Sequence, residues 1–208
     1  YIPEELDRDE YLGSYSSFIG SPLHQGQFQF DLWEKQPSNK YDWNRLMLEI
    51  QKYGVDKSNG KSICIAMGDG SDDPRQVEDL LLLVERGLAV AVASRYSRGG
   101  QFVGNKNFKY FLSKYSGLFL YTFFRIGTKD PTNMFKAYDK EFLDSVKFES
   151  GVGFTLGLEM VVKAKIYKKN IGEIPTIWID RTFGSSKFSF KDFTPKYLYW
   201  IMRLIKRR

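Results

Sequence analysis

The chain has 208 residues, of which 42% are hydrophobic and 16% aromatic, so it can bury a full core and is expected to form one domain with an appendage. Its net charge of +6 at pH 7 suits a phosphorylated substrate, an anionic lipid or a nucleic acid, and does not choose among them. The one cysteine, Cys64, cannot form an internal disulfide, and no apolar run has transmembrane length.

The first 41 residues show no clear periodicity: an acidic start is followed by a stretch rich in glycine, serine and glutamine, which predicts loop or appendage. His24, the only histidine, has no carboxylate or cysteine neighbours, so we assign it no function. We divide the chain into a poorly patterned N-terminal segment (residues 1–42), a core (residues 43–191) and a basic C-terminal helix (residues 192–208).

From residue 42 onward, helical and strand patterns alternate. Apolar residues at three- and four-residue steps predict a helix over residues 42–53, and the apolar run at residues 63–67 predicts a buried strand. A helix follows Pro74 and is expected to end before Gly87, and residues 88–94 predict a second buried, parallel strand. This pattern indicates a β-α-β unit with a right-handed crossover and therefore an α/β fold.

The turn after the first strand, GDGSDDP, carries three carboxylates: Asp69, Asp72 and Asp73. Ligand sites of open α/β sheets lie beyond the carboxyl ends of the strands, where carboxylates hold Mg²⁺ or Mn²⁺ against a phosphate. The alternative is a solvated turn in which Asp72 or Asp73 caps the next helix and Pro74 is its first residue. The two interpretations are compatible.

The second strand brings Ser94, Arg95 and Tyr96 to the same edge of the sheet, ahead of a basic, glycine-rich loop. Arg95 and Arg98 suit anionic oxygens, although a flexible solvated loop has the same composition. The position of this loop beside the acidic turn favours the functional interpretation. A second group of basic and hydroxyl side chains, also suited to phosphate, follows in the loop after residue 180: Arg181, Ser185, Ser186 and Lys187.

Two helices combine apolar and basic residues. Residues 105–126 carry an aromatic surface too broad for one core stripe, so this helix either lies centrally in the core or rests at a bilayer interface. The C-terminal residues predict a basic amphipathic helix that lies on a membrane or packs on the core with a solvated end. Between these helices we expect a strand at 133–138, a helix at 154–168 and an edge strand at 171–179, because Pro175 cannot donate to a ladder.

Five segments of the chain resemble the inverting family 2 glycosyltransferases, and within them the dolichyl- and polyprenyl-phosphate sugar synthases such as dolichol-phosphate mannosyltransferase. They are YGVDKSNGKSICIAMGDGSDDP, VASRYSRGG, FRIGTKDPTNMFKAY, ESGVGFTLGLEMVVKA and IGEIPTIWIDRTFGSSKF. One such segment is weak evidence, because acidic turns and glycine-rich loops are common. Five in the family's order argue against chance.

The resemblance implies a GT-A fold: a Rossmann-like, mostly parallel sheet flanked by helices, with a nucleotide-diphospho-sugar donor and a divalent metal at its carboxyl edge. It implies Asp69 as the main metal ligand, Asp72 or Asp73 as the second, and Asp130 as the group that deprotonates or orients the acceptor. The other implied site residues bind phosphate or assist catalysis: Ser94, Arg95, Lys136 in place of the usual arginine, Arg181, Ser186 and Lys187.

The reaction so implied moves a sugar with inversion to a polyprenyl phosphate or a surface polysaccharide, assisted by Mg²⁺ or Mn²⁺. Metal and cations stabilise the leaving nucleotide diphosphate, and a polyprenyl phosphate is already anionic, so it needs little help from a base. A lipid-linked acceptor implies peripheral binding at the cytoplasmic face of a membrane. No reader motif gathers the basic residues, so no nucleic-acid partner is expected.

The chain departs from the family upstream of Trp43. It lacks the Pro-x-Tyr-Asn-Glu-like and Asp-Asp-x-Ser-like strand ends that bind the nucleotide base and ribose in family members. The alternative hypothesis is therefore a non-catalytic, degenerate relative that serves as a binding or assembly module. Two further parallel strands beside the strand at residue 63 would complete a nucleotide pocket and favour the enzyme.

Overall fold

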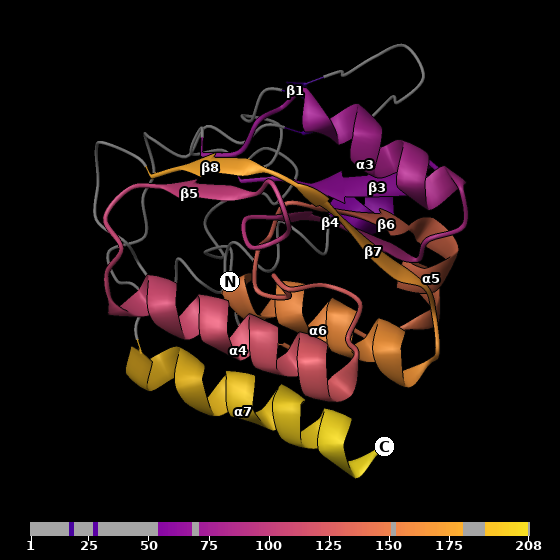
Figure 1. Ribbon diagram of the computed structural model, residues 1–208. Helices are drawn as coiled ribbons and strands as arrows, with labels where there is room; N and C mark the ends of the chain where they lie inside the picture. Colours follow the sequence, from indigo (N-terminus) through magenta and orange to yellow (C-terminus); the bar gives the residue numbers. More distant parts are fainter. Residues whose placement is uncertain are drawn as a thin grey trace, which may run out of the picture.

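The computed structural model describes residues 17–18, 27–28, 54–67, 71–150, 153–180 and 190–207. The helix predicted at residues 42–53 lies outside these ranges, as does His24. Within them the structure is a mixed α/β arrangement, with a sheet between helices (Figure 1).

The central sheet has four strands in the order β3 (Ser62–Ile65), β6 (Lys136–Asp139), β4 (Val90–Ser94) and β7 (Ile171–Pro175). Strand β6 pairs antiparallel with β3 and with β4, and β4 pairs parallel with β7. Three of the four strands therefore run in one direction, which confirms the mostly parallel α/β sheet expected from the sequence.

Strand β6 lies between β3 and β4, the two strands of the predicted β-α-β unit. These two strands are parallel to each other but are not neighbours. Ala137 of β6 is opposite Cys64 on one side and Ala91 on the other. The small side chains of Ala91 and Ala137 leave room for a helix to pack closely on this part of the sheet.

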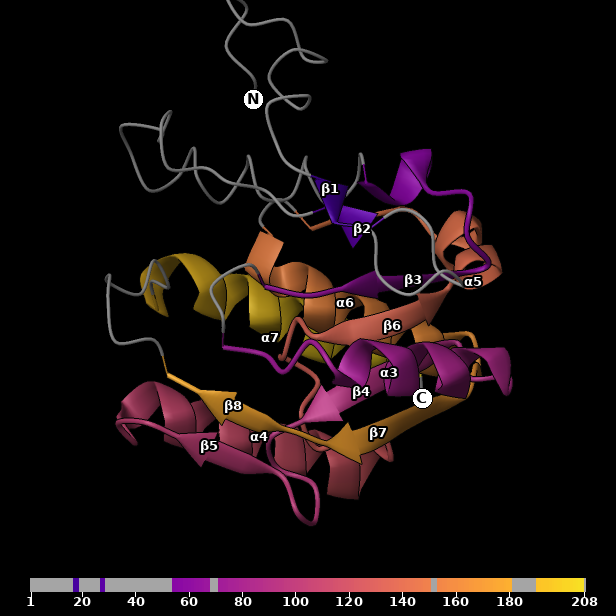
Figure 2. The ribbon, with the colours of Figure 1, turned by 90° about the horizontal axis from the view of Figure 1, so that it is seen from above.

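Helices cover both faces of the sheet (Figure 2). One face packs against α3 (Gln76–Glu85), whose leucines contact Ala91, Ala93 and Ala137. The other face, which includes Val90 and Val92, packs in one cluster with α6 (Gly153–Ile166) and the C-terminal helix α7 (Phe190–Lys206). Residues of β4 alternate between the two faces, as the period of a strand requires.

Two small sheets complete the described strands. Strands β5 (Gln101–Val103) and β8 (Ile177–Ile179) pair in parallel, and β8 follows β7 directly. Strand β7 pairs only with β4 among the described strands, so it is an edge of the central sheet, as predicted. It ends at Pro175, and residues 177–179, which were expected to continue it, form β8 in a separate sheet. Strands β1 (Ser17–Phe18) and β2 (Gln27–Phe28) pair only with each other in the part of the chain that the structure describes. The described sheet therefore ends at β3.

Helix boundaries follow local capping. Helix α3 begins at Gln76 and its N-cap is Arg75, so the expectation that Asp72 or Asp73 caps it and that Pro74 is its first residue is wrong. Asp73 instead accepts the N–H of Arg75 in the turn before the helix. Gly87 follows the C-cap with φ of 100°, the left-handed conformation that glycine adopts without strain. Asp139 caps the short helix α5 (Lys140–Ser145) through the N–H of Phe142.

Helix α4 (Phe108–Phe124) lies at the surface and turns its apolar side outward. Among its residues, all of which the structure describes, Gly117 and Leu120 are the buried ones. The alternative that this helix lies centrally in the core is therefore wrong. Its exposed large apolar residues are Phe108, Phe111, Leu112, Tyr115, Leu118, Phe119, Tyr121 and Phe123.

Helix α7 has two different sides. Trp200 and Leu204 are buried against the core, so the predicted packing of this helix is confirmed. Leu198, Met202 and Ile205 are each more than half exposed, at 52% to 55%. No helix within the described ranges is long and apolar enough to cross a membrane.

Candidate functional site

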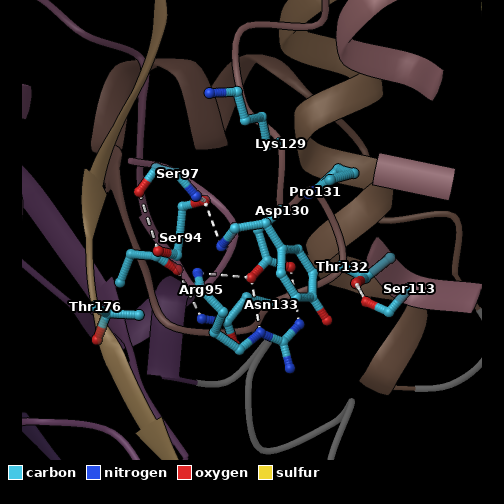
Figure 3. Close-up of polar contacts among 12 residues, drawn as sticks. Ser94, Arg95, Ser97, Ser113, Lys129, Asp130, Pro131, Thr132, Asn133 and Thr176 are labelled. Atoms are coloured by element: carbon cyan, nitrogen blue, oxygen red, sulfur yellow. Dashed lines mark hydrogen bonds and ion pairs between the residues drawn. The ribbon is translucent and has the colours of Figure 1, made fainter. Parts of the chain in front are cut away.

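The candidate site centres on an ion pair between Arg95, directly after β4, and Asp130, in the loop between α4 and β6 (Figure 3). Nε and the backbone N–H of Arg95 donate to Oδ2 of Asp130, at 2.7 and 3.0 Å. Nη2 of Arg95 donates to Oδ1 at 2.8 Å. The resemblance implied both residues, and the structure brings them together.

The pair is buried, and its electrostatics follow from that. Burial disfavours the charge on Arg95, but the attraction of the Asp130 carboxylate outweighs this cost, so the pKa of Arg95 lies above its ordinary value. Asp130 is fully buried, and both its oxygens accept hydrogen bonds from Arg95. In this arrangement Asp130 orients Arg95 and has no oxygen turned toward solvent to serve as a base.

Lys136 lies beneath the loop that carries Asp130. Its amine donates to the carbonyl oxygen of Pro131 at 3.1 Å and to that of Asn133. The side chain is fully buried, and burial lowers the pKa of Lys136 to about 7. The residue predicted to be catalytic thus supports the backbone of the loop from inside.

Ser94 is also buried and shapes the turn after β4. Its hydroxyl oxygen accepts the N–H of Ser97 at 3.0 Å and the N–H of Tyr96 at 3.4 Å. The Ser94 hydroxyl, predicted to bind phosphate, is therefore engaged by its own turn. Arg98, in the same turn, is exposed.

The two described aspartates of the acidic turn face different neighbours. Both oxygens of Asp73 accept from the guanidinium of Arg75, at 2.8 to 3.2 Å, on the exposed side of the turn. Asp72 accepts the N–H of Met67, and its charge acts on Arg95 and Lys136. Asp72 therefore lies within electrostatic range of the candidate site, whereas Asp73 is occupied by Arg75.

Five of the predicted ligand-binding residues lie outside the described residues: Asp69, Arg181, Ser185, Ser186 and Lys187. Among the residues that are described, no three histidine, cysteine or acidic side chains are grouped closely enough to hold a metal ion.

An aromatic cluster lines one side of Arg95. Phe102 of β5 stacks on Trp178 of β8, with 4.9 Å between ring centroids, and Tyr110 of α4 lies 4.8 Å from Phe102. The guanidinium of Arg95 lies 5.1 Å from the ring of Tyr96 and 5.8 Å from that of Trp178. These rings attract the cation and fix its plane, so Arg95 is held from two sides.

Three residues that support the Asp130 loop were not predicted from the sequence: Asn133, Thr128 and Glu173. Nδ2 of Asn133 donates to the carbonyl oxygen of Ala93 at 2.7 Å, which ties the loop to the end of β4. The hydroxyl of Thr128 and the N–H of Lys129, both in this loop, donate to Glu173 on β7. Glu173 belongs to the IGEIP segment, where a carboxylate within a strand was the available clue.

Sequence comparisons with known proteins find short matches, whereas a structural comparison finds a match over most of the chain. No family model matches the chain. Short stretches resemble the large chain of ribonucleoside-diphosphate reductase from Neurospora crassa (46% identical over 46 residues) and that from Caenorhabditis elegans (43% over 49 residues). These matches cover 22% and 24% of this chain but 5% and 6% of those proteins, so they show no family.

A solved structure resembles most of the chain. It is glucosyl-3-phosphoglycerate synthase from Mycobacterium tuberculosis in complex with uridine diphosphate, with a TM-score of 0.50 and 13% identity. The match covers 83% of this chain and 55% of that one, so this chain spans about half the length of its structural relative. At this identity the likeness concerns the fold alone, and the chain has a GT-A-type α/β fold.

Proposed function

We propose that the chain is a metal-dependent, inverting glycosyltransferase that moves a sugar from a nucleotide-diphospho-sugar to a polyprenyl phosphate or a surface polysaccharide. The observation that carries the proposal is the buried Arg95–Asp130 pair at the carboxyl end of β4 in a GT-A fold. Ligands of open α/β sheets bind at this edge. The structural relative binds uridine diphosphate, which supports a nucleotide donor.

The chain's own residues would stabilise the charge that develops on the leaving diphosphate. Arg95, preoriented by Asp130 and the aromatic cluster, supplies a fixed guanidinium, which is effective because it needs no reorganisation during the reaction. The side chains of Arg181, Ser186 and Lys187 would donate further hydrogen bonds to the phosphate oxygens. Mg²⁺ or Mn²⁺, held by Asp69 and Asp72, would neutralise diphosphate charge when bound; Asp73 would join only by leaving Arg75.

Asp130 has an orienting role in this proposal. Both of its oxygens already accept hydrogen bonds from Arg95. An acceptor phosphate is anionic near neutral pH and requires no strong base, so the engaged carboxylate is compatible with transfer to a polyprenyl phosphate. A hydroxyl of a polysaccharide would need a base from elsewhere. The geometry therefore favours the phosphate acceptor.

The outward sides of α4 and α7 suit peripheral binding to the cytoplasmic face of a membrane. Residues 105–129 contain no acidic residue, and their cations are Lys106, Lys109, Lys114, Arg125 and Lys129. The C-terminal residues 194–208 also lack acidic residues and end on four cations within six residues. Exposed aromatic side chains flanked by cations are typical of helices that lie at the surface of anionic bilayers.

Donor binding is tested by thermal unfolding with UDP or GDP, each with and without Mn²⁺. We expect one nucleotide to raise the melting temperature only with Mn²⁺, and Asp69→Asn to abolish the rise. Asp79→Asn, an exposed aspartate on α3, is the matched control and should keep it. The absence of any metal-dependent rise would contradict the proposal.

The same variants separate an enzyme from a binding module. Transfer of labelled sugar to a polyprenyl phosphate in vesicles, lost in Asp69→Asn and in Asp130→Asn but retained in Asp79→Asn, identifies the enzyme. If the chain binds a nucleotide but transfers sugar to none of a panel of polyprenyl-phosphate and polysaccharide acceptors, it is a binding module.

Membrane binding is tested by flotation with vesicles of neutral lipid and of neutral plus anionic lipid. Phe119→Asp places a charge on the outward side of α4, and Leu82→Asp does so on α3; the two side chains are 48% and 43% exposed. We expect the wild type and Leu82→Asp to float with vesicles that contain anionic lipid. Phe119→Asp should stay unbound in the bottom fraction of the gradient. Equal flotation of the two variants would contradict the assignment of α4.

A further inference from the structure

Glu173 connects the central sheet to the loop that carries Asp130. Its Oε2 accepts the hydroxyl of Thr128 at 2.9 Å and the N–H of Lys129 at 2.8 Å. The Thr128 oxygen in turn accepts the N–H of Asp130 at 3.0 Å, and Thr128 is fully buried. A chain of hydrogen bonds therefore runs from β7 to the residue that holds Arg95.

The register of the sheet explains why Glu173 can do this. Glu173 on β7 lies opposite Val92 on β4, three residues before Arg95. The carboxylate and the guanidinium thus start from neighbouring strands of one rigid sheet. The loop that carries Asp130 is hydrogen-bonded to both side chains: Thr128 donates to Glu173, and Asp130 accepts from Arg95. Thr128 and Asp130 are themselves joined by a hydrogen bond. These contacts hold the loop to β7 and to the end of β4, in addition to the bond from Asn133 to Ala93.

We propose that Glu173 is a positioning residue: through Thr128 it holds Asp130 where it orients Arg95 toward an anionic ligand. Figure 3 shows one terminal nitrogen of Arg95 turned away from Asp130, while the other nitrogens donate to it. The loop preserves this orientation of the guanidinium. The inference rests on the proposed function for the identity of the ligand, a nucleotide diphosphate, but its geometry is testable without a ligand.

The role depends on hydrogen bonding more than on charge. Both bonds to Glu173 end on the same oxygen, Oε2. A glutamine can place its carbonyl oxygen there and accept both bonds, because a carbonyl oxygen has two lone pairs. Glu173→Gln should therefore preserve the arrangement, and Glu173→Ala should release the loop. Thr128→Ser keeps the hydroxyl, whereas Thr128→Val removes it.

The loop contains its own control. The hydroxyl of Thr132 bonds to that of Ser113 on α4, at 2.9 Å, and this contact does not reach Asp130. Thr132→Val therefore removes a hydroxyl from the same loop without cutting the path from Glu173. A difference between Thr128→Val and Thr132→Val separates positioning from a general loss of stability.

The experiment follows the Nε–H of Arg95 by ¹⁵N NMR, assigned by its loss in Arg95→Lys. We expect a protected, shifted signal in the wild type, Glu173→Gln, Thr128→Ser and Thr132→Val. In Glu173→Ala and Thr128→Val the signal should return to the shift and exchange of a solvated arginine, with the amide spectrum of the sheet unchanged. An unchanged Arg95 signal in Glu173→Ala would overturn the inference.

Nucleotide affinity provides the functional readout. Where the wild type binds UDP or GDP with Mn²⁺, Glu173→Ala and Thr128→Val should weaken binding by about tenfold, and Glu173→Gln and Thr132→Val should not. If the wild type binds no nucleotide, the proposed function fails, while the Arg95 signal still decides the positioning role. Unchanged affinity in Glu173→Ala would contradict that role.

Discussion

Buried hydroxyl groups near the sheet differ in whether they are hydrogen-bonded, and this decides what their removal does. The phenol of Tyr138 is buried and has no hydrogen-bond partner among the described residues, whereas Thr128 makes two hydrogen bonds. We expect Tyr138→Phe to be neutral or to stabilise by up to ~1 kcal/mol, and Thr128→Val to destabilise by roughly 1–3 kcal/mol. Urea unfolding measures both, and a clear loss of stability in Tyr138→Phe would contradict this prediction.

Lys136 makes stability depend on pH in a direction that its burial determines. Its pKa is lowered to about 7 in the folded chain, so between pH 7 and its usual pKa near 10.5 the unfolded chain binds more protons. The cost of burying the charge is present at pH 7 and below and is relieved as the pH rises. We expect the free energy of unfolding of the wild type to increase from pH 7 to pH 10 relative to Lys136→Met.

Subtracting the free energy of unfolding of Lys136→Met from that of the wild type at each pH cancels the titration of all other groups. A difference that stays constant or falls over this range would show that the amine keeps its ordinary pKa.

At the scale of elements, α4 reaches the Asp130 loop through a glycine. A Cβ added at Gly117 would collide with the backbone carbonyl of Lys129 and would lie 3.2 Å from Cδ of Pro131. A carbonyl of the main chain cannot rotate away as a flexible side chain does. We expect Gly117→Ala to destabilise by about 1–3 kcal/mol, despite the higher helix propensity of alanine.

The control for this change is Gly54→Ala, because an added Cβ there meets nothing within 4 Å. Thermal unfolding compares the two variants, and equal melting temperatures would show that α4 does not rest on the loop. The prediction also bears on function, since a displaced loop would move Asp130 and Arg95 together.

At the scale of the whole molecule, charged groups join the C-terminal helix to the core. Lys163 on α6 pairs with Glu159 at 2.6 Å and with Glu149 at 3.0 Å, and Glu149 pairs with Arg203 on α7. Both cations also lie 5.2 Å from the centroid of the Trp200 ring. Arg203 thus completes a sequence of contacts that extends from α6 to α7.

We expect Arg203→Gln to destabilise the protein by roughly 0.5–1 kcal/mol, because it removes an ion pair and a cation–π contact. Lys206→Gln removes the same charge from the same helix turn at an exposed position and should have a smaller effect. Hydrogen exchange of the amides of Glu149 and Ser150, which bond to Glu159, should increase in Arg203→Gln only. Equal exchange in both variants would contradict the coupling.

Sequence alone determined the local elements of this protein. The strand at β4 and the helix α3 with Gly87 after it follow from periodicity and glycine conformation within a few residues. These signals are local, so they can be read from neighbouring residues. The position of Arg95 after a buried strand marked it as a candidate site residue, and the resemblance added Asp130, although not the bonds between them.

The tertiary structure decided what depends on residues far apart in the chain. The sequence did not show β6 between β3 and β4, because strand order is a matter of long-range pairing. An apolar side of a helix looks the same in sequence whether it faces the core or the solvent, so the structure was needed to place α4 outward. Likewise, only folding joins Arg95 to Asp130 and places Glu173 beside the loop that holds them.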